Sequence, residues 1–214
     1  MSLVHLTHNK IELALHQLRD GEGRPLLLLH GLGERTPAAA PEWTAAWPGP
    51  VYGLDFTGHG ASTVPHGGGY SAEILLADAD IALAHLGEVT LVGRGVGAYI
   101  ALMLAGARPQ LVHGTILCDG PGLSGGATGP TSSSFHSVDP PFDAPDPNAL
   151  IDLSRDLRPP DYATLFVRFA LEGSDLSSPF AVVAIVRPPW LAAVVEEVGV
   201  TVCTLSDALA LYTD

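Results

Sequence analysis

This chain contains two kinds of hydrophobic segment: some in which apolar and polar residues alternate, and some that are continuously apolar. Residues 2–7 and 11–19 alternate between apolar and polar side chains, which predicts two strands joined by a turn at residues 8–10. Residues 25–30 form a leucine-rich run of the kind found in a strand covered on both faces. The chain is therefore expected to begin with a hairpin and a buried strand.

Strands and helices continue to alternate along the rest of the chain. Ser71 precedes an apolar stripe that predicts a helix to about Leu86, and the apolar residues 96–107 predict a helix buried against a sheet. Strands alternating with helices predict an α/β fold with a mainly parallel sheet and right-handed crossovers. The other expected elements are strands that start at 51 and 114, strands at 89–92, 180–186 and 199–204, and helices at 40–47, 148–156, 160–172, 189–198 and 206–212.

One predicted strand leads directly into a glycine-rich turn before the apolar helix. Gly93, Gly95 and Gly97 have the spacing of a nucleophile elbow, a sharp turn that lifts one side chain above the sheet between small residues. The residue at the centre of this turn is Gly95, which has no side chain to attack a substrate. The turn therefore predicts the elbow and argues against the chemistry that an elbow usually carries.

Three further motifs accompany the elbow in a fixed order. They are His-Gly-Leu-Gly at residues 30–33, D-x-x-G-x-G-x-S at residues 55–62 and Asp-Gly-Pro at residues 119–121, each directly after an apolar strand. Together with the elbow they resemble the α/β-hydrolase superfamily over at least residues 11–121. The resemblance implies the α/β-hydrolase fold, a mostly parallel twisted sheet of about eight strands flanked by helices.

The expected domain organisation follows from length and from this resemblance. A chain of 214 residues is long enough for one domain, so we expect a single α/β-hydrolase-like domain over residues 1–214. Members of the superfamily carry a lid after the sixth strand, and here the composition changes to Gly, Ser, Pro and Asp at that point. We therefore expect a reduced lid over residues 120–178, with its loop at 120–147.

The resemblance also assigns three catalytic positions, and none holds the expected residue. The nucleophile position is Gly95, residues 185–190 after the penultimate strand contain no carboxylate, and no histidine follows His136. We therefore expect a degenerate triad with no catalytic residue. Asp119 is a candidate alternative acid, because some members place the acid after the sixth strand. The competing interpretation is that the Asp119 carboxylate caps the following turn.

The backbone donors of an oxyanion hole do not depend on the nucleophile side chain. The resemblance assigns these donors to the N–H groups of Leu32 and Val96, and Arg94 adds a cation beside them. The pocket is expected to include His30, Gly31 and Gly33 of the same turn, and a base role for His30 is the less favoured alternative. We expect this pocket to accept a carbonyl, a carboxylate or another small anionic group.

Charge and composition narrow the candidate partners. A net charge of −13 disfavours nucleic acids and anionic membranes, which attract basic surfaces. The histidines show no His-x-x-x-His or H-E-x-x-H spacing and no Cys-x-x-Cys occurs, so we expect no metal and no cofactor. Cys118 and Cys203 fall in apolar strands, which together with a start that lacks a leader pattern favours the cytoplasm.

Three functions remain open on these observations. The missing catalytic groups favour a non-hydrolytic module that binds a carbonyl- or carboxylate-bearing small molecule or a protein partner. The alternative is an esterase-like hydrolase, or a cofactor-free enzyme that uses the oxyanion hole with relocated catalytic groups. The third is a structural protomer, and a homodimer stays open as its assembly.

Overall fold

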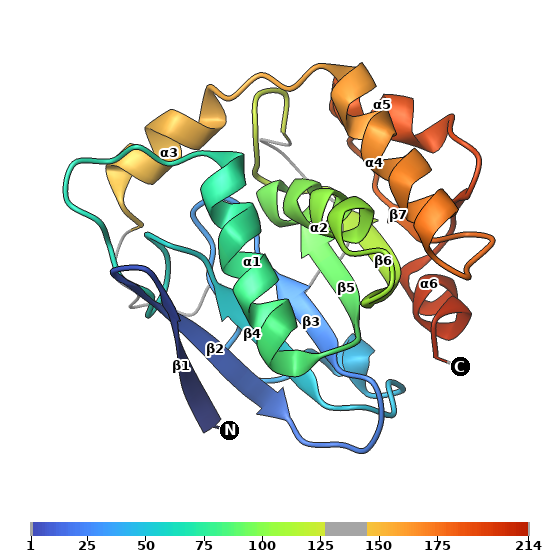
Figure 1. Ribbon diagram of the computed structural model, residues 1–214, viewed down its shortest axis with the longest axis horizontal. Helices are drawn as coiled ribbons and strands as arrows, with labels where there is room; N and C mark the ends of the chain where they lie inside the picture. The colour runs from blue at the N-terminus through green and yellow to red at the C-terminus, as the bar shows by residue number, and fades with distance from the viewer. Residues whose placement is uncertain (1, 127–144, 214) are drawn as a thin grey trace.

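An eight-stranded sheet carries helices on both faces in the computed structural model, which describes residues 2–126 and 145–213 (Figure 1). The strands are β1 (Ser2–His8), β2 (Ile11–Arg19), β3 (Leu26–Leu29), β4 (Val51–Asp55), β5 (Val89–Arg94), β6 (Val112–Cys118), β7 (Phe180–Val183) and β8 (Val200–Val202). The helices are α1 (Ala72–Leu86), α2 (Val96–Ala107), α3 (Pro147–Ser154), α4 (Pro160–Gly173), α5 (Pro189–Val195) and α6 (Leu205–Leu211), with the 3-10 turn η1 (Glu42–Thr44).

The strand order is β1-β2-β4-β3-β5-β6-β7-β8. β2 runs antiparallel to both of its neighbours, and the pairs from β4 to β8 are parallel. The architecture confirms the predicted mostly parallel sheet of about eight strands flanked by helices. Parallel strands bring their carboxyl ends to one edge, which is where ligands bind in open α/β sheets.

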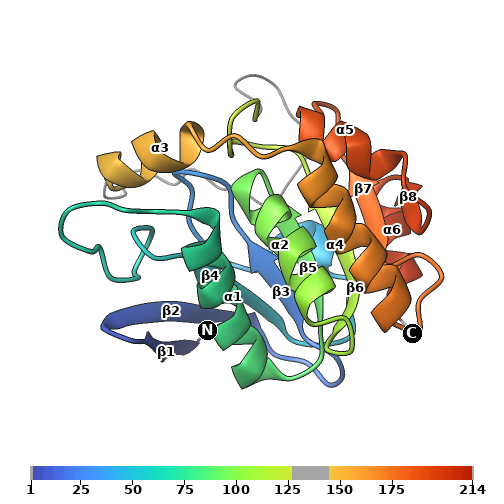
Figure 2. The same ribbon diagram turned by 45° about the horizontal axis from the view of Figure 1, so that its top comes forward.

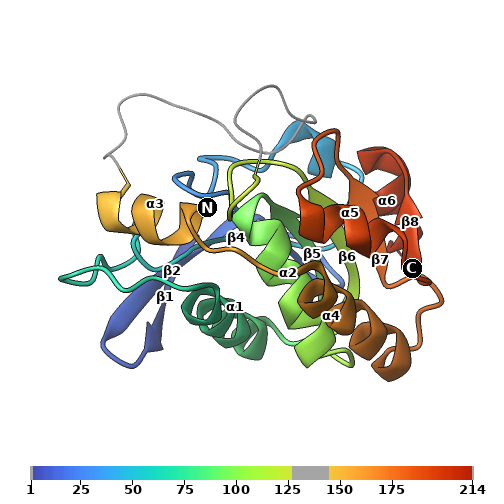
Figure 3. The ribbon, with the colours of Figure 1, turned by 90° about the horizontal axis from the view of Figure 1, so that it is seen from above.

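Two apolar cores separate the sheet from its helices. The larger core packs one face against α1, α2, α4 and α5, and the smaller core packs the other face against Trp47 and α6 (Figure 3). Tyr99 and Ile100 of α2 are fully buried, as expected for a helix that is apolar nearly all round. α4 packs along α2 in this helical layer (Figure 2).

Most predicted elements form, and the differences lie at their ends. The predicted helix at 40–47 is reduced to η1, and the predicted strands at 180–186 and 199–204 shorten to β7 and β8. Beyond β7 the N–H groups of Ile185 and Val186 donate to the Asp119 carboxylate instead of to a neighbouring strand, so the ladder does not continue through these residues. Cys203 lies just beyond β8 and is half-buried rather than inside a strand.

The expected lid divides into three parts in the structure. Residues 120–126 pack against the elbow, residues 127–144 lie outside the described residues, and α3 and α4 follow. α3 lies near the 30–33 turn, with Leu150 beside Gly33. Within residues 2–126 and 145–213, no helix is long and apolar enough to cross a membrane.

Candidate functional site: a closed elbow

The turn between β5 and α2 has the backbone of an elbow. Gly95 adopts φ 56° and ψ −117°, a conformation that L-residues rarely occupy, and it is the N-cap of α2. Its N–H donates to the Cys118 carbonyl at 3.1 Å, which ties the turn to the neighbouring strand β6. The elbow therefore sits at the carboxyl edge of the sheet.

The two N–H groups that the resemblance assigns to an oxyanion hole converge on one oxygen atom. Leu32 N–H donates to the Pro121 carbonyl at 2.8 Å, and Val96 N–H donates to the same oxygen at 3.1 Å. These are the distances that such donors make with an oxyanion. Here the acceptor is a peptide carbonyl from the chain itself.

The space beside Gly95 is nearly filled by the same segment. A cavity of about 10 Å³ remains next to Gly95, between Asp119, Leu123 and Trp190. A water molecule needs roughly 10–15 Å³ of such space, so the residual cavity holds one water at most. As far as residues 2–126 and 145–213 show, the expected pocket for a carbonyl- or carboxylate-bearing ligand is closed in this conformation.

Glycine at position 95 is what allows the Pro121 carbonyl to approach. A Cβ atom at this position would overlap the Pro121 carbonyl oxygen and lie 2.7 Å from the Pro121 carbonyl carbon. A Cβ atom on Gly122 would likewise lie 2.8 Å from the Val96 nitrogen. Residues 120–122 therefore fit only against an elbow without a side chain.

Arg94 holds together the two loops that surround the elbow. Its Nε donates to Glu34 Oε1 at 2.9 Å, and its Nη1 donates to the Asp119 carbonyl at 2.7 Å. Glu34 Oε2 accepts the Gly31 N–H at 2.9 Å. The Arg94 side chain is only 4% exposed, so the predicted cation lies between protein groups and does not face an open pocket.

Asp119 caps the turn after β7. Its Oδ2 accepts the N–H groups of Ile185 at 2.9 Å and Val186 at 2.7 Å, and the residue is buried. A buried carboxylate that accepts backbone hydrogen bonds is costly to remove, because its donors would be left without partners. The carboxylate therefore holds the turn after β7 and not the turn that follows Asp119 itself, and the alternative-acid interpretation stays a prediction.

His30 is buried beneath the turn with both ring nitrogens in use. Nδ1 lies 2.8 Å from the Gly31 carbonyl and Nε2 accepts the Phe56 N–H at 3.1 Å, so Nδ1 carries the proton. Burial lowers the pKa of His30 from its ordinary value. With its lone pair already bonded, His30 is a framework residue in this conformation and has no nitrogen available to act as a base.

His59 repeats this arrangement beside it. Its Nε2 accepts the Gly33 N–H at 3.2 Å and its Nδ1 donates to the Thr57 carbonyl at 3.1 Å. Burial lowers the pKa of His59 to about 4, and proximity to His30 adds to the shift. Both imidazoles therefore brace the backbone of the turns in their neutral form.

The residue that sequence reasoning missed is Pro121. The only signals were glycines on both sides of it, Gly120 and Gly122, and the glycine at the elbow. Within residues 2–126 and 145–213, no group of three His, Cys, Asp or Glu side chains is arranged to hold a metal ion. His136 lies outside the described residues, and the expectation of no metal and no cofactor stays a prediction.

Comparison with known proteins was made on sequence and on structure. A family model described as "Alpha/beta hydrolase family" matches residues 26–213. The (E)-2-((N-methylformamido)methylene)succinate hydrolase of Acinetobacter baylyi is 33% identical over 114 residues, which cover 49% of this chain and 41% of that enzyme. The match thus spans less than half the length of that curated relative.

One of the similar solved structures has the same fold over nearly the whole chain. A hypothetical protein from Pseudomonas aeruginosa PAO1 superposes with a TM-score of 0.64 at 19% identity, covering 96% of this chain and 90% of that one. The thioesterase domain from the curacin biosynthetic pathway is 28% identical with a TM-score of 0.49, covering 55% of this chain and 43% of that domain.

Proposed function

The chain belongs to the alpha/beta hydrolase family, and from this premise we propose that it is a non-hydrolytic member that works by binding. Its partner would be a small molecule or another protein. The observation that carries this proposal is the Pro121 carbonyl, which accepts both candidate oxyanion donors above an elbow that has glycine in place of a nucleophile.

Covalent hydrolysis would need two things that this site lacks in the described conformation. A nucleophile must attack from the centre of the elbow, and the oxygen of the tetrahedral intermediate must occupy the donors of Leu32 and Val96. Gly95 supplies no nucleophile, and Pro121 occupies the donors. A substrate carbonyl would have to displace an internal hydrogen-bond acceptor of the same chemical type.

The second candidate is hydrolysis with relocated catalytic groups, and the hydrolase relative from Acinetobacter baylyi favours it. On this alternative, residues 120–122 would move away from the elbow and expose the two donors. A nucleophile or an activated water would then have to come from another part of the chain. The two functions differ in whether any serine becomes covalently labelled and whether any ester is turned over.

Cys118 and Cys203 are both free thiols, which supports a reducing compartment such as the cytoplasm. The same free thiols require the assay to be run with a reductant, so that disulfide formation does not alter the protein.

The test is incubation of the full chain with a fluorophosphonate probe and with short-chain nitrophenyl esters. We expect neither labelling nor turnover above that of the unfolded protein at the same concentration, which controls for surface nucleophiles. Stoichiometric labelling of one serine, or turnover that disappears on unfolding, would overturn the non-hydrolytic function and support relocated groups.

A further inference from the structure

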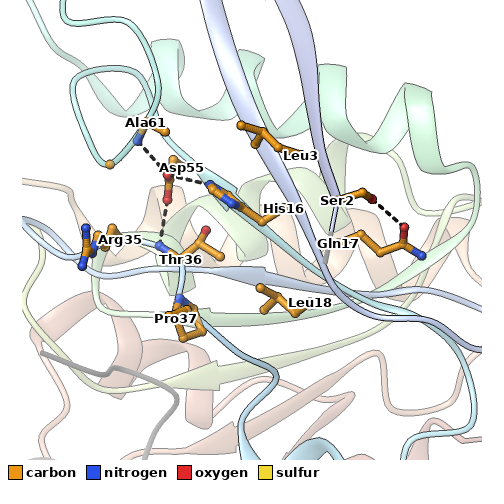
Figure 4. Close-up of a pocket in the computed structure, with 12 residues that line it drawn as sticks. Ser2, Leu3, His16, Gln17, Leu18, Arg35, Thr36, Pro37, Asp55 and Ala61 are labelled. Carbon is orange, nitrogen blue, oxygen red and sulfur yellow. Dashed lines mark hydrogen bonds and ion pairs between the residues drawn. The ribbon is translucent and has the colours of Figure 1, made fainter. Parts of the chain in front are cut away.

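A second cavity lies away from the elbow, on the face of the sheet opposite α1. It has a volume of about 520 Å³ and opens between the β1–β2 hairpin and residues 35–38 (Figure 4). Its walls come from strands and loops, namely Ser2, Leu3, residues 16–18, residues 35–38, Asp55 and residues 60–61. We call this cavity the edge cleft, because β1 is the edge strand of the sheet.

Strand register places a histidine and a carboxylate together on the wall of the edge cleft. On β2, Leu15 belongs to the larger core under α1, so the next residue, His16, points to the opposite face of the sheet. Ala14 pairs with Asp55 of β4 and His16 pairs with Gly53, which puts the His16 and Asp55 side chains on the same face. His16 Nε2 lies 2.9 Å from Asp55 Oδ2.

The Asp55 carboxylate is ionised and acts only as an acceptor. It accepts hydrogen bonds from His16 Nε2, from the Thr36 N–H at 2.7 Å and from the Ala61 N–H at 2.9 Å. Burial opposes ionisation, but the hydrogen bond from His16, the nearby His30 and the two N–H groups lower the pKa of Asp55 to about 2. An ionised carboxylate has no proton to donate, so His16 Nε2 carries the proton of their hydrogen bond.

The second ring nitrogen of His16 is therefore left as an acceptor. When Nε2 carries the proton of a neutral imidazole, Nδ1 carries a lone pair. Within residues 2–126 and 145–213, His16 Nδ1 makes no hydrogen bond and is not buried, and the side chain is 29% exposed on the wall of the edge cleft. Because a carboxylate bound to one ring nitrogen fixes both the tautomer and the orientation of the ring, this acceptor is held in place.

Thr36 adds a hydroxyl to the floor of the edge cleft. A Cβ atom at Gly53 would overlap the Thr36 side chain, so the glycine is what lets Thr36 pack directly on β4. Thr36 is 7% exposed, and in the part of the chain that the structure describes its Oγ1 is buried without a hydrogen-bond partner. Buried hydroxyls in this state are uncommon in folded proteins. The edge cleft thus combines an open acceptor with a hydroxyl that lacks a partner.

The other groups along the edge cleft are apolar or already engaged. Leu3, Leu18 and Pro37 provide apolar surface. Arg35 also lines the cavity, but it already has an interaction within the chain, so it is not counted among the groups that would hold a ligand. The net charge of −13 works against an anionic ligand.

We propose that the edge cleft binds a small neutral molecule with a hydroxyl group on an apolar body, the chemistry of a simple phenol. The ligand hydroxyl donates to His16 Nδ1, and because a hydroxyl is also an acceptor, it suits a site that contains the unpaired Thr36 hydroxyl. The apolar body lies against Leu3, Leu18 and Pro37, which fits the usual composition of small-molecule sites, mostly apolar with a few polar groups.

This inference rests on the proposed binding function, and it is tested separately from the absence of hydrolysis. Ester turnover would overturn the non-hydrolytic function without any change in the binding of phenol. Failure of phenol binding would overturn the edge cleft as a ligand site and leave the closed elbow as it stands.

The experiment is a titration of the ¹⁵N-labelled full chain with phenol at about pH 8, followed by NMR. At this pH an ordinary imidazole has one ring proton and a phenol keeps its hydroxyl proton. We expect saturable shifts confined to amides near residues 16–18, 35–38 and 60–61, and a long-range ¹H–¹⁵N spectrum in which His16 has a protonated Nε2 and an unprotonated Nδ1. Anisole, whose methyl ether cannot donate, should bind about fivefold more weakly than phenol.

Two variants and a matched control test the residues. His16→Gln keeps an N–H donor for Asp55 but removes the Nδ1 lone pair, so it should bind phenol about fivefold more weakly. Ala38→Trp, at an exposed lining position, should obstruct the edge cleft and abolish the shifts. The control is His113→Gln on β6, because the His113 side chain is 33% exposed, close to the 29% of His16, but does not line the edge cleft. This variant should bind phenol as the unchanged protein does.

The proposal is overturned if phenol gives no saturable shifts at these residues, or if anisole or benzoate binds there as tightly as phenol. It is also overturned if His16 Nδ1 carries the ring proton, or if His113→Gln weakens binding as much as His16→Gln does. If His16→Gln fails to fold, as its spectrum would show, Ala38→Trp and the comparison of phenol with anisole on the unchanged protein decide.

Discussion

Replacing Gly95 by alanine tests whether the Pro121 carbonyl rests against the elbow. The added Cβ atom has two separate consequences. It forces an L-residue into φ 56°, and it overlaps the Pro121 carbonyl oxygen. Residues 120–122 would then have to move, and the N–H groups of Leu32 and Val96 would lose their common acceptor.

The two consequences can be separated with a second glycine. Gly87, the C-cap of α1, has φ 80° and ψ −138°, close to the conformation of Gly95, but nothing lies within 4 Å of a Cβ atom built there. Gly87→Ala should therefore lower the unfolding free energy only by the cost of the backbone strain that it introduces, about 1–3 kcal/mol. Gly95→Ala should lose this and also two hydrogen bonds of about 1 kcal/mol each, so its unfolding free energy should fall by about 2 kcal/mol more.

Urea unfolding followed by tryptophan fluorescence measures both losses, provided the dependence on urea concentration is the same for all variants. Hydrogen exchange gives an independent readout, because the amides of Leu32 and Val96 should be protected in the unchanged protein and exposed in Gly95→Ala. Equal losses for the two alanine variants, with both amides still protected, would refute the closed elbow.

Three further predictions follow from the same site. Gly95→Ser should displace Pro121 and still show no ester turnover, because no histidine follows His136 to act as its base; turnover in a nitrophenyl ester assay would contradict this. Asp119→Ala should lower the unfolding free energy by about 2–4 kcal/mol in urea titrations, because two buried N–H groups lose their acceptor. Asp119→Asn keeps a carbonyl oxygen and should lower the unfolding free energy by less. The folded state holds His59 neutral, with a pKa of about 4 compared with 6.5 in the unfolded chain. This difference corresponds to about 3 kcal/mol of stability, which is fully present above pH 6.5 and is lost as the pH falls towards 4. Urea titrations at several pH values should show this loss, and His59→Gln should show less of it.

The sequence was sufficient for the fold because the informative residues act locally. Glycines two residues apart specify the elbow, and apolar runs of strand length specify buried strands, without reference to distant parts of the chain. The same reasoning placed the candidate donors at Leu32 and Val96. It could not place their acceptor, because Pro121 reaches them only through the packing of three loops that are far apart in the sequence.

The contact between His16 and Asp55 on the sheet was unpredictable for a related reason (Figure 4). His16 and Asp55 lie 39 residues apart, and their contact depends on the register between β2 and β4, in which Ala14 pairs with Asp55 and His16 with Gly53. A pattern of period two shows which residues share a face, but it does not show which residue of the next strand lies opposite. The absence of a side chain at Gly53, which admits Thr36, becomes meaningful only once that register is known.

The absence of a side chain at position 95 and the closure of the elbow are linked. A side chain at position 95 and the Pro121 carbonyl require the same space, so the chain can hold one or the other. With glycine at the elbow, the two donors, the Arg94–Glu34 pair and the Asp119 cap all support the closed arrangement of residues 119–122. Covalent hydrolysis at this elbow would therefore require more than a serine at position 95, because a base would have to be supplied and residues 119–122 would have to leave contacts that stabilise the fold.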